Sequence, residues 1–191
     1  GELRLSKDSG RSWAVKLTGL GDSGHWLRFA SDKVGWLMLG DGSLRRSIDG
    51  GETWGAELPI RVQYGSFQFL DEKLGWAVNA DGHVMQTADG GTTWAATQQQ
   101  PPVLTRGVQF RSAMQGLAVG AYGIVETRDG GKTWARRFTA DPKYYPYNAI
   151  RQAFYADATH VWALGVYGDF LRSSDGGETW EIATSNVSIP P

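Results

Sequence analysis

Residues 122–134 read YGIVETRDGGKTW, and the octapeptide that ends this stretch recurs along the whole chain. It occurs five times, and the Trp residues that close neighbouring copies are 41, 40, 40 and 46 residues apart. Five copies at a nearly constant period indicate a repeat architecture in which each copy belongs to one supersecondary unit. The copies, called boxes below, are SKDSGRSW (6–13), SIDGGETW (47–54), TADGGTTW (87–94), TRDGGKTW (127–134) and SSDGGETW (173–180).

Two further phrases recur upstream of the boxes, and both read as β-strands. One is of the GWAV type and begins at Gly35, Gly75, Gly116 and Val161. The other is short and aromatic and begins at His25, Gly65, Gly107 and Arg151. Asp-Gly or Tyr-Gly then separates the second strand from the third, which is a signal for a short hairpin, and the box separates the third from the fourth. No stretch has a sustained period of 3.6 residues, so we expect no long helix.

Four short antiparallel strands in about 40 residues, repeated along the chain, predict an all-β fold of the β-propeller type. We expect a single domain over residues 1–191, with four complete four-stranded blades and one partial N-terminal blade. Three alternatives remain open for the ring. The chain is a fragment of a longer propeller, another chain or segment completes the ring, or the chain closes alone as a small ring.

The box residues are expected to be structural. An Asp at the start of a turn accepts hydrogen bonds from backbone N–H groups two or three residues on, and the box Trp packs beneath the hairpin. One carboxylate per turn is too few ligands for calcium, and an active site is built once, so we expect no metal and no catalytic residue here. The residues concerned are Asp8, Asp49, Asp89, Asp129, Asp175, Trp13, Trp54, Trp94, Trp134 and Trp180.

The remaining tryptophans are interpreted as packing residues. Trp36, Trp76 and Trp162 share the second position of the GWAV phrase, and Leu117 replaces them in the third of its four copies. A site that accepts either Trp or Leu is typical of packing between blades. Trp26 is outside both repeated positions, and we expect it in the core.

Composition excludes several classes of protein. The 191 residues include 19 basic and 20 acidic side chains, a net charge of −1, which argues against a nucleic-acid clamp or a polybasic membrane anchor. No apolar run approaches the roughly 20 residues of a membrane-spanning helix. There is no Cys, which excludes disulfides and thiolate catalysis. The 26 Gly and 9 Trp residues suit a β-protein with many tight turns.

The boxes resemble the Asp-box (BNR) repeat, S/T-x-D-x-G-x-T-W, and YGIVETRDGGKTW resembles the repeats of the photosystem II stability/assembly-factor family. This resemblance implies a non-catalytic propeller that binds a protein partner, needs no cofactor and works after export to a periplasm, thylakoid lumen or extracellular space. The sequence shows no signal peptide. Asp-boxes also occur in sialidases and other glycosidases, so a glycoside hydrolase or glycan-binding propeller is the alternative.

Residue types needed for glycosidase or zinc chemistry are poorly placed. A sialidase FRIP signature is absent, and the acids outside the boxes are mostly single turn or loop residues, not the carboxylate pair that glycosidases need. Glu126 holds a strand position that Arg46, Gln86 and Arg172 hold in other copies, so we interpret it as solvated surface. His25, His83 and His160 lack zinc-ligand spacing.

A candidate partner surface lies on the rim opposite the boxes, where the Asp-Gly and Tyr-Gly turns and the inter-blade loops of residues 55–64, 95–106 and 135–149 are expected. The last loop, ARRFTADPKYYPYNA, carries the six-residue lengthening of the repeat and is rich in Tyr and Arg, as binding hot spots are. A glycan ligand, or tyrosines that fold onto their own blade, are the other interpretations. The expected partner-binding residues are Arg106, Tyr122, Arg136, Arg137, Tyr144, Tyr145, Tyr147 and Tyr167.

Overall fold

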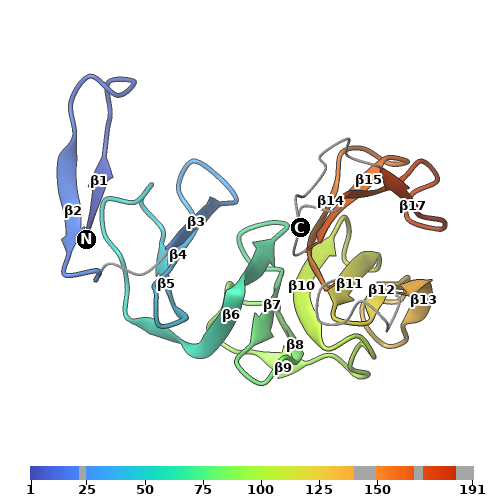
Figure 1. Cartoon of the computed structure of the whole chain (residues 1–191). Coiled ribbons are helices and arrows are strands. Elements are labelled where there is room, and N and C mark those ends of the chain that lie inside the picture. The colour runs from blue at the N-terminus through green and yellow to red at the C-terminus, as the bar shows by residue number, and fades with distance from the viewer. Residues whose placement is uncertain (22–24, 140–148, 166–169, 184–191) are drawn as a thin grey trace, which may run out of the picture.

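The computed structural model describes residues 1–21, 25–139, 149–165 and 170–183, and every regular element in these residues is a β-strand. Four four-stranded units and one two-stranded unit follow one another in an open arc (Figure 1). All strand pairs are antiparallel. The predicted all-β propeller fold, with four complete blades and a partial N-terminal blade, is therefore confirmed.

The five blades are numbered from the N-terminus. The first contains β1 (Glu2–Leu5) and β2 (Ala14–Thr18). The second contains β3 (Trp26–Phe29), β4 (Gly35–Met38), β5 (Ser43–Ser47) and the first half of β6 (Glu57–Phe69). The third contains the second half of β6, β7 (Gly75–Asn79), β8 (Val84–Thr87) and β9 (Ala95–Ala96). The fourth contains β10 (Thr105–Phe110), β11 (Gly116–Gly120), β12 (Gly123–Thr127) and β13 (Ala135–Thr139). The fifth contains β14 (Ile150–Tyr155), β15 (Val161–Gly165), β16 (Phe170–Ser173) and β17 (Glu181–Ala183).

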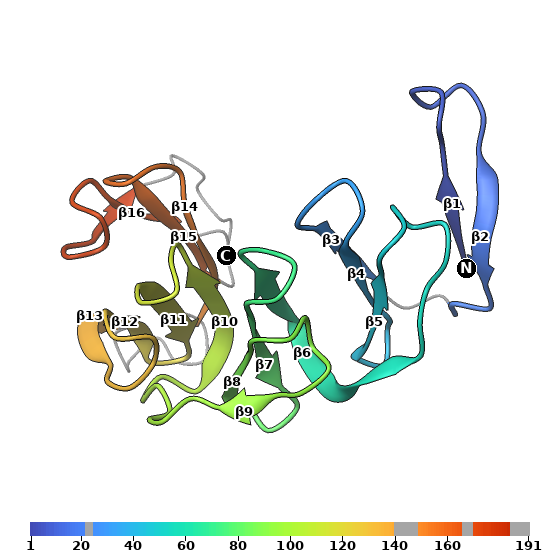
Figure 2. The ribbon, with the colours of Figure 1, turned by 180° about the vertical axis from the view of Figure 1, so that it is seen from behind.

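The blades are arranged around a common centre. The first strands of the last three blades, β6, β10 and β14, lie toward the inside of the arc, and β13 and β17 lie at its outside (Figure 2). β10 contacts both β6 and β14, so the first strands of these blades stand side by side. Each box connects the third strand of its blade to the fourth, as predicted from the repeats.

The expected inter-blade loops are partly strands. Residues 95–96 and 105–106 belong to β9 and β10, and residues 135–139 form β13. The expected loop of residues 55–64 lies almost wholly in β6, which runs from Glu57 to Phe69 and pairs first with β5 and then with β7. Ile60 and Val62 are buried on this strand, which an exposed connection would not allow. Gly65, with φ of 70°, lies at the register irregularity between the Val62–Asn79 and Phe67–Ala77 pairs of β6 with β7.

Each box turn is closed by the same set of hydrogen bonds. In the second box the Ser47 hydroxyl accepts from the Gly51 N–H at 2.8 Å and donates to Asp49 Oδ1 at 2.8 Å. Asp49 Oδ1 also accepts from the Thr53 N–H at 2.9 Å. The Asp therefore reaches the N–H four residues on, rather than two or three residues on as expected. The other four boxes repeat this pattern.

The box tryptophans pack against the first strand of their own blade. Trp54 meets Phe29 edge-to-face with ring centroids 6.3 Å apart, and the third and fourth blades repeat this contact between Trp94 and Phe69 and between Trp134 and Phe110. In the first blade Trp13 is 58% exposed, because no first strand is present beside it.

Contacts between blades depend on the GWAV position. Trp36 of the second blade stacks on Phe69 of the third, with centroids 3.5 Å apart, and Trp76 stacks on Phe110 at 3.9 Å. Both Trp side chains are fully buried, as is Leu117 at the same position of the fourth blade. The predicted role in packing between blades is thus confirmed at these three positions.

Trp26 does not lie in the core as expected. It stands on the inside strand β3 with 37% of its surface exposed, and a Cβ at Gly65 would lie 2.5 Å from its ring. The indole therefore covers Gly65 at the inner wall of the arc.

We expect Trp76→Ala to be strongly destabilising. Removing a fully buried, stacked indole should lower the free energy of unfolding by about 4 kcal/mol, because the transfer term and the cavity term add. Trp162→Ala is the matched control, since Trp162 is only half-buried in the last blade and should cost less than about 2 kcal/mol. Urea denaturation measures both values, and equal losses would contradict the role given to the stacking.

We expect the free energy of unfolding to fall steeply as the pH drops below about 4. Hydrogen bonds from the Thr53 hydroxyl and N–H lower the pKa of Asp49 to about 2, and corresponding bonds lower the pKa of the other box aspartates to about 2. Because these pKa values are lower in the folded state, the carboxylates stabilise the fold above their unfolded pKa. That contribution disappears as the pH falls towards 2.

Thermal melts between pH 7 and pH 2 test this, with Asp49→Asn as the comparison. The Asn variant keeps one acceptor oxygen and cannot titrate, so its melting temperature should change less with pH than that of the unsubstituted protein. Identical pH profiles would contradict the assignment.

Candidate binding site

A cleft of about 550 Å³ opens on the rim opposite the boxes. Its walls are the turn of residues 80–83, the loop of residues 100–106, Gln63 of β6 and Tyr122 in the turn between β11 and β12. These segments come from the third and fourth blades, so the cleft, called the rim cleft below, lies where two blades meet.

The loop that lines the rim cleft is held firmly. The Val103 side chain is fully buried, its N–H donates to the Pro101 carbonyl at 2.9 Å, and its carbonyl accepts from the Tyr122 N–H at 3.3 Å. Arg136 of β13 then donates to the carbonyls of Tyr122, at 2.8 Å, and Pro102, at 3.0 Å. The loop and the turn are therefore fastened to each other by Arg136.

Leu104 has an unusual conformation for an exposed apolar residue. Its φ is +46°, in the left-handed region that non-glycine residues rarely adopt, and its side chain is 57% exposed. Gly120 makes room for this conformation, because a Cβ there would lie 2.2 Å from the Val103 carbonyl oxygen and 2.3 Å from that of Leu104. Next to it, the buried Thr105 hydroxyl has no hydrogen-bond partner among the described residues.

A second hollow, of about 660 Å³, lies along the inside of the arc and is called the channel below. Its walls come mostly from the first strands β3, β6, β10 and β14. Its charged lining residues are Arg28, Arg106 and Arg151, and the described lining includes no Asp or Glu. Arg106 lines both the channel and the rim cleft, so the two hollows adjoin at this residue.

The channel wall is cross-linked between blades. Gln68 of β6 donates to the Phe110 carbonyl at 2.7 Å and accepts from the Phe110 N–H at 2.6 Å. Ser66 accepts from the Val108 N–H at 3.1 Å. These side chains bond backbone groups of β10 and so fix the spacing between β6 and β10, the strand that carries Arg106.

The structure brings together only part of the predicted partner surface. Arg106 and Tyr122 line the rim cleft and Arg136 fastens its wall. Arg137 is half-buried and reaches the box side of the fourth blade, where it pairs with Glu126 and Glu178. The four predicted residues that lie outside the described residues are Tyr144, Tyr145, Tyr147 and Tyr167.

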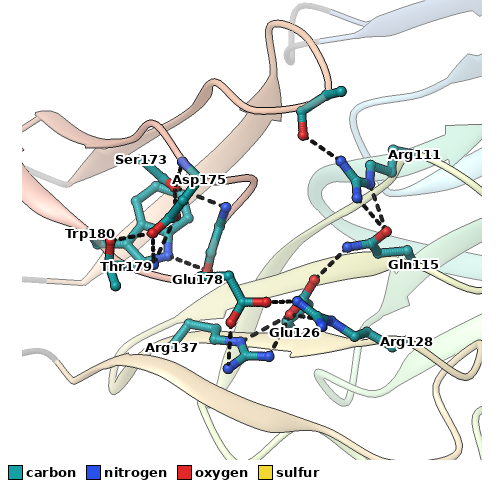
Figure 3. Close-up of polar contacts among 12 residues, drawn as sticks. Arg111, Gln115, Glu126, Arg128, Arg137, Ser173, Asp175, Glu178, Thr179 and Trp180 are labelled. Carbon is teal, nitrogen blue, oxygen red and sulfur yellow. Dashed lines mark hydrogen bonds and ion pairs between the residues drawn. The ribbon is translucent and has the colours of Figure 1, made fainter.

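The interpretation of Glu126 as solvated surface is wrong. Its side chain is fully buried and accepts from Gln115 at 2.7 Å, Arg128 at 3.1 Å and Arg137 at 2.8 Å (Figure 3). Arg128 and Arg137 also pair with Glu178 in the box of the fifth blade. This charged network therefore joins the fourth blade to the fifth.

The same interface holds a half-buried tyrosine. The Arg111 guanidinium carbon lies 5.3 Å from the centre of the Tyr155 ring, and Arg111 also donates to Gln115 and to the Ala158 carbonyl. Burial, and secondarily the charge of Glu126, raise the pKa of Tyr155 well above its ordinary value. Leu117 in place of Trp was the sequence signal that this interface differs from the others.

Other kinds of site are not found in the described part of the chain. Within it, no group of three or more His, Asp or Glu side chains is placed to hold a metal ion. A search of the same residues found no helix with the length and apolar character needed to cross a membrane.

Comparison with known proteins bears on the family. Residues 101–191 match the family model "Photosynthesis system II assembly factor YCF48". YCF48 from Cyanidioschyzon merolae is 21% identical, with a TM-score of 0.65 over 85% of this chain and 56% of that one. An ancestral GH74 enzyme is 14% identical, with a TM-score of 0.68 over 97% of this chain and 28% of that one. No match to a protein of curated function was found.

A further structure, of YCF48 bound to a D1 peptide, is 18% identical with a TM-score of 0.48 over 83% of this chain and 81% of that one, too distant to carry an argument. The other two likenesses, both under 25% identity, show the fold alone, and this chain spans about half of one protein and a quarter of the other. The match to the family model is a likeness in sequence, whereas the two solved structures are similar to this chain in fold. The chain is thus an all-β propeller protein whose C-terminal part, residues 101–191, resembles the photosynthesis system II assembly factors.

Proposed function

We propose that this chain is a non-catalytic binding module of the assembly-factor type, and that it takes an acidic segment of a partner protein in the channel. The observation that carries the proposal is the charge of the channel lining, which presents Arg28, Arg106 and Arg151 and includes no described Asp or Glu. The whole protein is close to neutral, so this positive charge is a local feature of the channel.

Arginine is suited to such a site. Its planar guanidinium presents several donors in a fixed geometry and forms paired hydrogen bonds with carboxylates. Trp26, Phe67 and Val108 contribute apolar surface to the same hollow. Charged bonds near apolar surface are screened less than those in open water, which favours a specific carboxylate over free salt ions.

The geometry supports binding more than hydrolysis. A glycosidase needs two carboxyl groups at a spacing between about 5 and 10 Å across the bond to be cut, and the described lining of the channel includes no carboxyl side chain. Both carboxylate oxygens of Glu126 are occupied by Gln115 and by two arginines. The likeness to a GH74 enzyme concerns the fold and adds no carboxylate to the channel.

The rest of the proposal follows the family resemblance. The partner is a protein undergoing assembly, and the chain works after export to a periplasm, thylakoid lumen or extracellular space. Tyr122, Tyr144, Tyr145, Tyr147 and Tyr167 are proposed to widen the contact surface beyond the channel mouth, while Arg136 and Arg137 position the blade that carries them. Completion of the ring by further blades or by another chain also belongs to the proposal.

We expect Arg28→Gln combined with Arg151→Gln to weaken the binding of an acidic peptide. A fluorescein-labelled Glu-rich decapeptide should bind the double variant about tenfold more weakly, because two charge-assisted contacts are lost. Lys73→Gln combined with Lys132→Gln removes the same charge from exposed positions outside the channel lining and is the matched control. Fluorescence anisotropy at low and moderate salt measures the affinity. Equal weakening of both double variants would show that peptide binding depends on the net charge of the protein and not on the channel, which would contradict the proposed site.

We expect Glu126→Gln to destabilise the protein by about 3 kcal/mol, because it leaves two arginines without their buried partner. Glu178→Gln, at the exposed end of the same network, should cost less than about 1 kcal/mol. Urea denaturation gives both values, and an aryl-glycoside panel is assayed in parallel. Turnover by the unsubstituted protein that Glu126→Gln abolishes without a loss of stability would refute the non-catalytic proposal.

A further inference from the structure

The rim cleft combines three features that the fold alone does not require. Leu104 is held in a strained backbone conformation with its apolar side chain in solvent. Tyr122 stands 47% exposed among the residues of the same cleft. Thr105 lines the cleft, and its buried hydroxyl has no partner among the described residues. Strain of this kind persists only where the surroundings enforce it, and it is concentrated at binding and active sites.

The surroundings do enforce it here. Val103 is anchored in the core, Gly120 leaves the space that the loop needs, and Arg136 fastens the loop to the turn that carries Tyr122. The exposed apolar side chains are therefore presented by a preorganised wall, and little conformational entropy is lost when a ligand covers them.

We propose that the rim cleft is an apolar subsite that takes a large apolar side chain of the same partner segment whose acidic group lies in the channel. This inference rests on the proposed function. The occupant is an extended polypeptide, because Arg106 lines both hollows and a single strand can pass from one to the other. Because the two hollows adjoin at Arg106 and a strand advances about 3.3 Å per residue, we expect the acidic and apolar residues of the segment to lie within about three positions of each other.

The contacts in the cleft fit such a segment. Leu104, Pro102 and Tyr122 offer apolar surface for the side chain. The exposed His83 side chain can satisfy a backbone group of the peptide. Tyr122 adds an aromatic ring, the side-chain type that contributes most at binding hot spots.

Leu104 offers a variant that separates binding from folding. Leu104→Asn removes the apolar side chain, and Asn tolerates the left-handed conformation better than Leu. Leu104→Gly removes the side chain and the strain together, and this gain offsets the greater freedom of glycine in the unfolded chain. Both variants should melt within about 2 °C of the unsubstituted protein. Ile48→Asn is the matched control, because Ile48 is 66% exposed on the second box, on the opposite rim.

The experiment starts from a phage-displayed library of random 12-residue peptides selected on the unsubstituted protein. Enriched peptides are synthesised with a fluorescent label, and their affinities are measured for the Leu104 variants, the Arg28/Arg151 double Gln variant and Ile48→Asn. We expect enriched peptides to carry an acidic residue and a large apolar residue within about three positions. We expect both Leu104 variants to bind about tenfold more weakly and Ile48→Asn to bind normally.

A double-mutant cycle gives the decisive result. Alanine in place of the apolar residue of the peptide should weaken binding to the unsubstituted protein about tenfold and to Leu104→Asn hardly at all. Peptides whose affinity falls in the Arg28/Arg151 double Gln variant but not in the Leu104 variants would overturn this inference and leave the proposed function standing. Peptides whose affinity falls in neither would overturn both the inference and the proposed function. Leu104-dependent binding on a glycan array, without peptide binding, would assign the cleft to a sugar and overturn the inference.

Discussion

The stacking of one blade on the next is the interaction on which the rest of the structure depends. A hairpin-connected sheet of four short strands buries too little surface to be stable alone, so each blade needs a neighbour. Trp36 and Trp76 supply that contact by lying flat on Phe69 and Phe110. The same phenylalanine rings also meet the box tryptophans edge-on, so one ring joins the inner strand, the outer hairpin and the preceding blade. The spacing of the arginines in the channel follows from this arrangement.

The interface between the fourth and fifth blades shows that a charged network can join two blades where a stacked aromatic ring joins the others. Where Leu117 replaces Trp, the space and the polarity change together, and the Glu126 network with its arginines connects the blades in place of the stacked ring. A buried charge cluster is stable only when each member keeps its partners. This interface is therefore more sensitive to single substitutions than its area alone would suggest.

The sequence predicted the repeated features well and the unique ones poorly. The boxes, the strand order and the packing role of Trp36, Trp76 and Leu117 could be read from the period, because each signal occurs in several copies. Glu126 was misjudged because its burial depends on Arg137 and Glu178, whose approach is a tertiary event without a local signature. Trp26 was misplaced because β3 lines the channel, and the strained backbone of Leu104 has no counterpart among the described residues of the other repeats.

The box aspartates have a consequence for the direction in which ligands arrive. Their low pKa keeps five negative charges on one rim even in a mildly acidic compartment, where free carboxyl groups begin to take up protons. The channel arginines remain positive under the same conditions. The contrast between the box aspartates and the arginines of the channel therefore persists when the surroundings are acidified. An approaching acidic chain would be drawn toward the channel arginines and away from the box aspartates before any contact forms.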